Sequence, residues 1–315
     1  MYLTVKRVDK LKLFVTGGCG YVGSHFVAIA KRSGHEVVVF DNLSTGYAGS
    51  VAEGDLRFGD LLDLECVVHS MKSCDAVVHF AAKSVVQESS LLELDYWRTN
   101  VVGTQNLLMA MEENGIEKIL LSSTAAVYGD SYVGSPLSES SQCRPVNCYG
   151  MTKLVAENLV AAWAARTNAR AISFRYFNAA GALPEERIGE QHIPETHLIP
   201  NVIAVARSAS ETLVVNGSGY PTPDGTCVRD YIHVADIAES HLVGLQYMES
   251  SSNFFEVFNV GSGIGYSILE IIDACENVAK KTVRYRLGSS RQGDPAILVA
   301  QIDRAERVLG WKPKY

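Results

Sequence analysis

Tyr149 and Lys153 stand four residues apart, which is about one helical turn, so their side chains would share one helix face. A tyrosine with an ordinary pKa of about 10 is a poor base at neutral pH, but a neighbouring ammonium favours its phenolate. Such a pair could take the proton of an alcohol while the alcohol is oxidised by loss of hydride. The same spacing at Tyr2 and Lys6 precedes the first expected strand, so position distinguishes the two pairs.

A hydroxyl at the end of the preceding strand would complete this site. The run Leu121–Thr124 supplies Ser122, Ser123 and Thr124 where an apolar stretch ends. We expect Thr124 to point at the substrate oxygen. The alternative is an ordinary strand terminus rich in Ser and Thr.

A glycine pattern near the N-terminus indicates the hydride acceptor. Gly17, Gly20 and Gly23 follow an apolar run and open an amphipathic one. Glycine is needed where the chain turns tightly and where backbone approaches a pyrophosphate, and a helix N-terminus presents free N–H groups to phosphates. The pattern predicts a dinucleotide site rather than a plain turn.

Asp41 selects between the two nicotinamide dinucleotides. It ends the second expected strand, where a carboxylate can accept hydrogen bonds from ribose hydroxyls and would repel the extra phosphate of NADP. No arginine follows within residues 42–46. We therefore expect NAD.

Further residues fall at the same edge of the expected sheet. Asp60 could bond the adenine amino group or cap a helix, the small Ala81 and Ala82 would let backbone pass close to the cofactor, and His79 reads as a core histidine. The expected NAD-binding set is Gly17, Gly20, Tyr21, Val22, Gly23, Asp41, Asn42, Asp60, Leu61, Phe80, Ala81, Ala82, Asn100, Ser122, Tyr149, Lys153 and Tyr176.

The elements that must position these residues alternate in type along the first half of the chain. Strands apolar throughout are buried on both faces, which is typical of a parallel sheet covered by helices. This predicts an α/β fold of Rossmann type, a doubly wound parallel sheet. The expected strands are 12–16, 36–40, 76–80, 118–122 and 170–174, and the expected helices are 21–33, 61–71, 89–114 and 149–167.

The composition of the sequence changes after Arg175, where prolines and glycines cluster. These residues predict a loop-rich segment that closes over a substrate. A helix at 234–247 and a buried strand at 255–260 then return. We therefore expect a smaller C-terminal substrate-binding domain interleaved with the first. The NAD-binding domain would comprise 1–176 plus about 232–260, and the substrate-binding domain 177–231 plus 261–315.

Composition limits the partners. The chain has 315 residues, 47% hydrophobic and 20% charged, with a formal net charge of -7 and no dense basic cluster, which argues against nucleic acid. No apolar run approaches the roughly 20 residues that span a bilayer. Seven cysteines without a Cys-x-x-Cys pair are typical of reduced thiols in the cytoplasm. No metal ion is expected.

Taken together, the glycine pattern, Thr124 and the Tyr-x-x-x-Lys pair resemble the extended short-chain dehydrogenase/reductases, and among them the UDP-hexose 4-epimerases. The resemblance runs from about Leu13 to Lys314. It is most specific over Val15–His25, Asp41–Gly46, Ser122–Gly129, Arg175–Gly181, Tyr220–Val234 and Arg291–Pro295.

The resemblance implies a role for each matching residue. Tyr149 would be the base, Lys153 its modulator and Thr124 the hydroxyl that bonds the sugar O4. The implied substrate-binding set is Thr124, Tyr149, Asn178 on the UDP moiety, Leu198 and Asn216 along the nucleotide, Arg229 and Arg291 on the diphosphate, and Asp294 on the uridine ribose. Two positions depart from the pattern: Lys83 lies one residue before the place of a phosphate-binding lysine, and His197 stands where some members have an asparagine beside the nucleotide.

The implied activity is NAD-dependent epimerisation at C4 of a UDP-hexose through a transient 4-keto sugar, in a homodimer. Epimerases of UDP-N-acetylhexosamines, UDP-pentoses or UDP-glucuronate stay open, and Leu298 stands where family analogy places control of an N-acetyl group. A 4,6-dehydratase would need an acid and a base after Thr124, where Ala125 and Ala126 stand. A non-catalytic NAD-binding regulator is the alternative of a different class.

Overall fold

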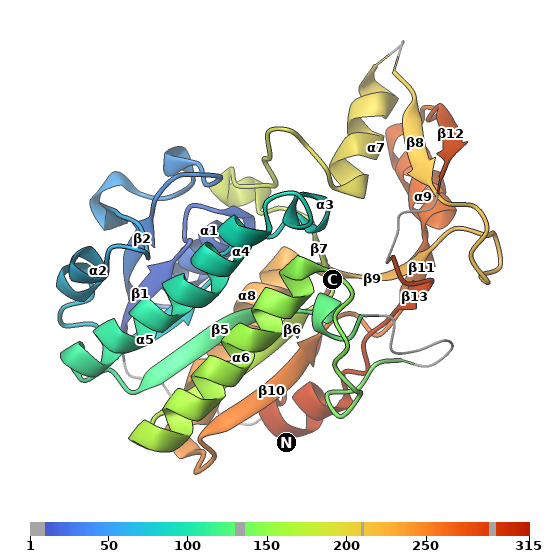
Figure 1. The fold of residues 1–315 in the computed structure, drawn as a ribbon. Helices are drawn as coiled ribbons and strands as arrows, with labels where there is room; N and C mark the ends of the chain where they lie inside the picture. Colours follow the sequence, from blue (N-terminus) through green and yellow to red (C-terminus); the bar gives the residue numbers. More distant parts are fainter. Residues whose placement is uncertain (1–9, 130–135, 209–210, 290–293) are drawn as a thin grey trace, which may run out of the picture.

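The computed structural model describes residues 10–129, 136–208, 211–289 and 294–315. Its centre is a seven-stranded parallel sheet in the order β3-β2-β1-β4-β5-β6-β10 (Figure 1). This order is that of doubly wound dinucleotide-binding sheets, and it confirms the predicted Rossmann-type fold. The strands are β1 Lys12–Thr16, β2 Glu36–Asp41, β3 Leu56–Phe58, β4 Ala76–His79, β5 Lys118–Thr124, β6 Arg170–Tyr176 and β10 Phe255–Val260.

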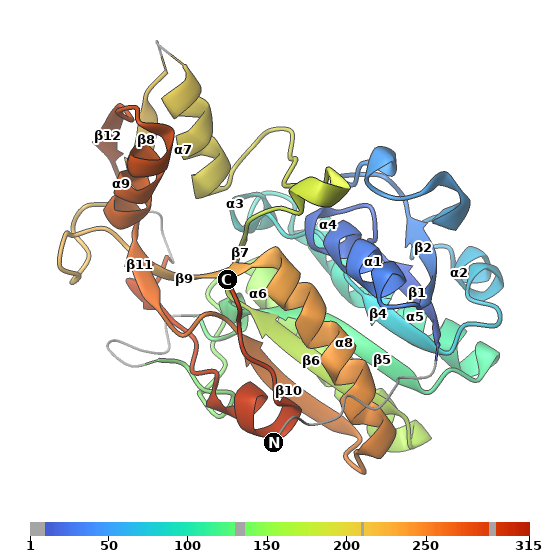
Figure 2. The same cartoon turned by 180° about the vertical axis from the view of Figure 1, so that it is seen from behind.

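Helices cover both faces of this sheet. The helices α1 (Tyr21–Arg32) and α8 (Val234–Ser250) pack together on one face, which Figure 2 shows in front. On the other face lie α2 (Leu64–Ser70), α5 (Gly103–Asn114) and α6 (Cys148–Thr167) (Figure 1). The strands between these layers are apolar on both faces because neither face meets water.

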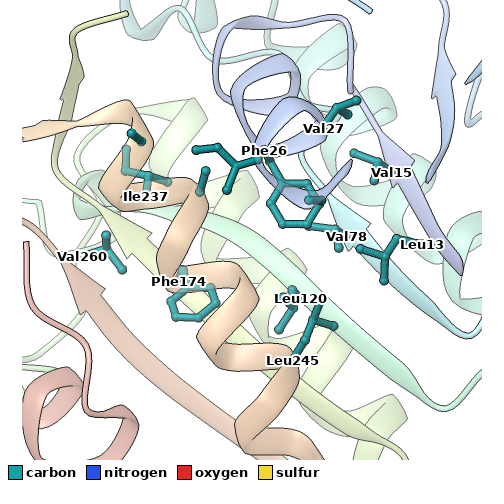
Figure 3. Packing of buried hydrophobic residues seen from close by; sticks show 14 of the residues in the cluster. Leu13, Val15, Phe26, Val27, Val78, Leu120, Phe174, Ile237, Leu245 and Val260 are labelled. Atoms are coloured by element: carbon teal, nitrogen blue, oxygen red, sulfur yellow. The ribbon is translucent and has the colours of Figure 1, made fainter. Parts of the chain in front are cut away.

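The core between the sheet and the pair α1 and α8 is built from large apolar side chains (Figure 3). Phe26 of α1 and Ile237 of α8 are fully buried over Val15 and Phe174 of the sheet. Full burial of one such side chain contributes roughly 1.5–3 kcal/mol. The core therefore fixes the carboxyl ends of the strands, where the predicted site residues lie.

The helix expected at 89–114 differs from prediction. It consists of α3 (Val86–Ser89), α4 (Glu93–Trp97), a π-helical turn at Arg98–Val102 and then α5. The turn places Asn100 so that its side-chain amide accepts from Lys83 N at 2.8 Å and donates to Lys83 O at 3.0 Å. Likewise α2 begins at Leu64 rather than Leu61, because the Asp63 side chain caps it.

The C-terminal part forms a second lobe, seen beyond the sheet in Figure 1. Its helices are α7 (Leu198–Arg207) and α9 (Ile268–Ala279), which share an apolar cluster with β8 (Leu213–Asn216). The strand β8 pairs with β12 (Tyr285–Gly288). A four-stranded sheet joins β7 (Asn178–Ala180), β9 (Val228–His233), β11 (Gly265–Ser267) and β13 (Ile297–Leu298). The segment expected to be loop-rich thus holds four regular elements, while the predicted domain boundaries stay a prediction.

Short helical turns complete the described chain. They lie at Ala48–Ser50, Glu53–Asp55, Ala125–Val127, Pro184–Glu186 and Ala305–Leu309. Of the helices in the described ranges, none is both long and apolar enough to cross a bilayer.

Candidate active site

The predicted catalytic residues meet where β5 ends and α6 begins. Asn147 caps α6 by accepting a hydrogen bond from Gly150 N at 2.8 Å, which sets Tyr149 in the first turn and Lys153 one turn later. Thr124 is the last residue of β5, and its hydroxyl lies near enough to Tyr149 to lower the pKa of that phenol. The sequence therefore placed these three residues correctly on their elements, although their roles stay predictions.

Burial shapes the acid–base properties of this group. It raises the pKa of Tyr149 to about 12, while the nearby Thr124 hydroxyl lowers this pKa. Lys153 is only 4% exposed, and its burial lowers its pKa to about 8 while the charge of Glu157 raises it. Both shifts disfavour the charged form, so the chain by itself holds Tyr149 as a phenol at neutral pH.

Glu157, one turn beyond Lys153, is a residue that the sequence analysis missed. It is 3% exposed, and its carboxylate accepts hydrogen bonds from Arg175 Nε at 3.0 Å and Arg175 Nη2 at 2.7 Å. It also accepts from Ser123 and Ser173. The spacing Tyr149, Lys153, Glu157 repeats every four residues, so the signal for a shared helix face was present.

Two aromatic residues enclose this group. Tyr96 packs edge-on against Tyr149, with ring centroids 6.5 Å apart, and donates a hydrogen bond to Val85 O at 2.6 Å. The Arg175 guanidinium lies 4.9 Å from the centroid of the Tyr128 ring. Nothing in the spacing of Tyr96 or Tyr128 indicated these contacts, because both depend on how separate elements pack.

The glycine run forms the turn expected of a dinucleotide site. Gly17 has φ +68°, and a Cβ there would lie 2.5 Å from Ala81 N, so only glycine fits between β1 and β4. A Cβ at Gly23 would lie 2.2 Å from Gly17 O, which shows how closely α1 approaches the turn.

Gly20 meets a different environment from these two. It is the N-cap of α1, and among the described residues no side chain caps the helix there. A Cβ at Gly20 would meet Gly17 O at 3.3 Å and no other atom of the described chain within 4 Å, its two neighbours in sequence aside. The N–H groups of Tyr21 and Val22 thus begin a helix that no described side chain caps, which fits a pyrophosphate.

Asp41 is held in place by the same turn. Its carboxylate accepts from Cys19 N at 2.9 Å and from Leu43 N at 2.8 Å. Asn42 donates to Asp60 at 2.8 Å, so two further predicted cofactor residues lie side by side. These groups form the adenosine end of the predicted site, at the carboxyl ends of β2 and β3.

Several other predicted cofactor residues have contacts within the protein. Phe80 and Ala81 donate backbone hydrogen bonds to Thr16 O, and Leu61 is buried. Tyr176 is hydrogen-bonded to His241, and burial raises the pKa of Tyr176 while Ser122 lowers it. His79 bridges Thr16 Oγ1 at 2.7 Å and Thr104 Oγ1 at 3.0 Å, in keeping with a core histidine.

The described substrate-binding candidates other than Thr124 and Tyr149 lie on the second lobe. Arg229 and Asp294 form an ion pair, so these two predicted ligands meet. Asn178 is exposed at the start of β7, Leu198 is the first residue of α7, and Asn216 ends β8. Arg291 lies outside the described residues. Lys83 lies 4.0 Å from Glu88 Oε2, and its role stays open.

The fold and this site define a dinucleotide-dependent enzyme, and the comparisons identify its family. The family described as the NAD dependent epimerase/dehydratase family matches residues 13–261, and the chain belongs to it. A UDP-glucose 4-epimerase from Halalkalibacterium halodurans is 42% identical over 310 residues, covering 97% of this chain and 91% of that protein.

Solved structures agree with this assignment. The structure of UDP-glucose 4-epimerase from Brucella ovis in complex with NAD has a TM-score of 0.92 at 39% identity, covering 97% of this chain and 94% of that one. UDP-glucose-4-epimerase from Stenotrophomonas maltophila, with bound NAD and formylated UDP-arabinopyranose, has a TM-score of 0.91 at 36% identity over the same shares. These matches confirm the predicted family, the predicted cofactor NAD and the predicted isomerase class.

Proposed function

We propose that the chain interconverts UDP-glucose and UDP-galactose by epimerisation at C4, with NAD as a resident cofactor. The observation that supports this most is the arrangement of Thr124, Tyr149 and Lys153 at the end of β5 and the start of α6. The relatives named above are UDP-glucose 4-epimerases. The Gly20 turn and the fixed Asp41 carboxylate fit NAD.

The chain's residues then have separate tasks. Tyr149 takes the O4 proton, and Thr124, whose hydroxyl lowers the pKa of Tyr149, bonds the same oxygen. When bound, NAD supplies the hydride acceptor and donor at C4 and a positive charge that favours the phenolate. Lys153 adds an ammonium to the same helix face, and Arg229 with Asp294 holds the nucleotide. The 4-keto sugar turns and regains hydride on its other face.

Other UDP-sugars remain the second candidate. Leu298, at the position where family analogy places control of an N-acetyl group, is half-buried in β13. One structural neighbour is a UDP-Glc/GlcNAc 4-epimerase, and another was solved with UDP-glucuronic acid and NAD. A panel with UDP-N-acetylgalactosamine, UDP-arabinose and UDP-galacturonate, read by mass and stereochemistry, ranks these substrates.

The direct test is incubation with UDP-galactose and no added NAD. We expect UDP-glucose to form without NADH release, and stoichiometric NADH with no epimer would overturn the proposal. Tyr149→Phe should abolish turnover and keep NAD and UDP binding, whereas Tyr285→Phe, on the exposed strand β12, should leave turnover unchanged. An active Tyr149→Phe enzyme would contradict the assignment of the base.

We also propose a cytoplasmic homodimer formed through the face of α4, α5 and α6. Leu94 of α4 is 78% exposed and Met109 of α5 is 42% exposed, and a dimer formed through these helices would cover both apolar side chains. Light scattering of the purified protein tests the dimer, and Leu94→Glu should give monomers. An unchanged dimer in Leu94→Glu would place the interface elsewhere.

A further inference from the structure

Four potential metal ligands gather in the segment that leads into α7. They are Glu190, His192, Glu195 and His197, and one ligand atom from each lies within 4.8 Å of all the others. The cluster lies beside the first turn of α1, where the ring of Tyr21 meets that of His192 edge-on at 6.4 Å between centroids. The proposed epimerisation assigns no task to these four side chains.

Two ligand atoms of the cluster are buried and make no hydrogen bond of regular geometry with another described residue, although ion pairs with the two histidines stabilise the Glu190 carboxylate and lower its pKa to about 2. The Glu190 side chain is only 9% exposed, and its Oε1 has no hydrogen-bond partner among the described residues. It lies 2.8 Å from His197 Nδ1 and 3.5 Å from His192 Nδ1, but without the geometry of a hydrogen bond. Within the same described ranges His192 Nδ1 is also buried without a partner. Orphaned polar atoms of this kind are costly unless a ligand satisfies them.

We propose that Glu190, His192, Glu195 and His197 bind one zinc ion as a structural site. Imidazole nitrogens and carboxylate oxygens are zinc ligands, whereas Mg²⁺ and Ca²⁺ prefer oxygen alone. In a tetrahedral zinc site, bonds of about 2.1 Å place the ligand atoms about 3.4 Å apart. The nitrogen–oxygen distances in the cluster run from 2.8 to 3.8 Å, and all four ligand atoms lie within 4.8 Å of one another, so closure around zinc would draw the widest pair together by about 1 Å.

The backbone around the cluster already orients one ligand. Glu195 Oε1 accepts hydrogen bonds from Thr196 N and His197 N, both at 2.8 Å, which leaves Oε2 facing His192 Nδ1 at 3.8 Å. Such outer contacts fix a ligating carboxylate before the metal binds. With all four positions taken by protein, the site has no open position for water, which separates structural from catalytic zinc.

The location of the cluster indicates what the ion would stabilise. His197 is the N-cap of α7 and Leu198 its first residue, while Tyr21 of α1 donates a hydrogen bond to Gly181 O at 2.7 Å near the start of the same connection. A zinc ion would therefore tie the start of α7 to the region beside α1. It would hold the second lobe's first helix in place without taking part in proton or hydride transfer.

The test measures metal, not turnover. The wild-type protein, purified without a metal-affinity tag and dialysed against a weak chelator, should contain about one zinc per chain by mass spectrometry. After zinc removal with a strong chelator, Co²⁺ alone should bind at one per chain and give the intense visible absorption of tetrahedral cobalt. A wild-type protein that neither retains zinc nor shows this saturable Co²⁺ spectrum overturns the proposal and leaves a hydrogen-bonded ion-pair cluster.

Variants locate the site. Glu190→Gln keeps the size of the side chain and should lower the retained zinc and the cobalt absorption at least tenfold, as should His197→Asn. The matched control is the double variant Glu65→Gln/His69→Asn, which removes a carboxylate and an imidazole from the exposed side of α2 and should keep full metal content. Equal metal in Glu190→Gln, His197→Asn and the control would place the ion elsewhere and overturn the assignment.

Discussion

The buried pair of Glu157 and Arg175 yields the sharpest prediction. Glu157→Gln changes no volume, but it places an amide N–H₂ among side chains that all donate: Arg175, Ser123 and Ser173. It also leaves the Arg175 guanidinium, 5% exposed, without its counter-charge. Removing one partner of a buried ion pair costs about 3–5 kcal/mol. We expect the free energy of unfolding to fall by that amount.

The chain offers a matched control for this substitution. Glu112 accepts two hydrogen bonds from Arg166, as Glu157 does from Arg175, but the Glu112 and Arg166 side chains are 40% and 63% exposed. Glu112→Gln should therefore cost less than about 1 kcal/mol. Urea unfolding followed by circular dichroism measures the free energy of unfolding of both variants, which are compared provided that the dependence of this free energy on urea concentration is the same. Equal losses in the two variants would refute the claim that burial makes the first pair costly to break.

A second measurement separates lost stability from an effect on the site. The Glu157 charge raises the pKa of Lys153, which burial lowers to about 8. Glu157→Gln should therefore lower that pKa further, and the alkaline limb of the kcat profile, which reports loss of the ammonium, should move to lower pH. Glu112→Gln should leave the limb in place. An unshifted limb in a folded Glu157→Gln enzyme would make the residue purely structural.

Three further outcomes follow from the site. Thr124→Val should lower kcat about 10- to 100-fold, because a hydrogen bond to a charged group contributes about 1.5–3 kcal/mol, and it should raise the pKa of Tyr149. Thr124→Ser keeps the hydroxyl and should keep most of the activity in the same pH-rate assay. Below pH 8, Lys153→Met should have a higher urea midpoint than the wild type. Above pH 8 this difference should shrink, because the wild-type lysine, whose pKa burial lowers to about 8, is then neutral in the folded protein and still charged in the unfolded one. Asp41→Ser should shift the ratio of bound NAD to bound NADP toward NADP, measured by extraction of the bound cofactor.

The sequence predicted the central sheet well because strands that are buried on both faces appear in the sequence as short runs of apolar residues. The strand at Lys12–Thr16 has the predicted bounds, and the predicted position of Asp41 at the end of its strand is correct. The cofactor turn followed from glycine chemistry, which depends on neighbours in sequence. Such local features can be predicted from residue type and spacing.

The second lobe was less predictable because its pairings join distant residues. Val228 of β9 pairs with Ile297 of β13, and β7 pairs with β9 across about 50 residues of chain, with strands only two to six residues long. Strands this short contain too few residues to show the alternation of apolar and polar side chains that marks a strand in the sequence. The cluster from Glu190 to His197 was missed for a related reason, since its side chains converge only through the irregular backbone before α7.

The charges of the interior alternate in sign from the site inward. The Lys153 ammonium is followed by the Glu157 carboxylate and then by the Arg175 guanidinium, so the buried set carries one excess positive charge. Arginine stays protonated in proteins, so any loss of positive charge must come from Lys153. Glu157 therefore acts as the counter-charge for both cations. Without Glu157 the lysine would lose its proton first, and Tyr149, whose pKa burial raises to about 12, would lose the only cation on its own helix face that favours its phenolate.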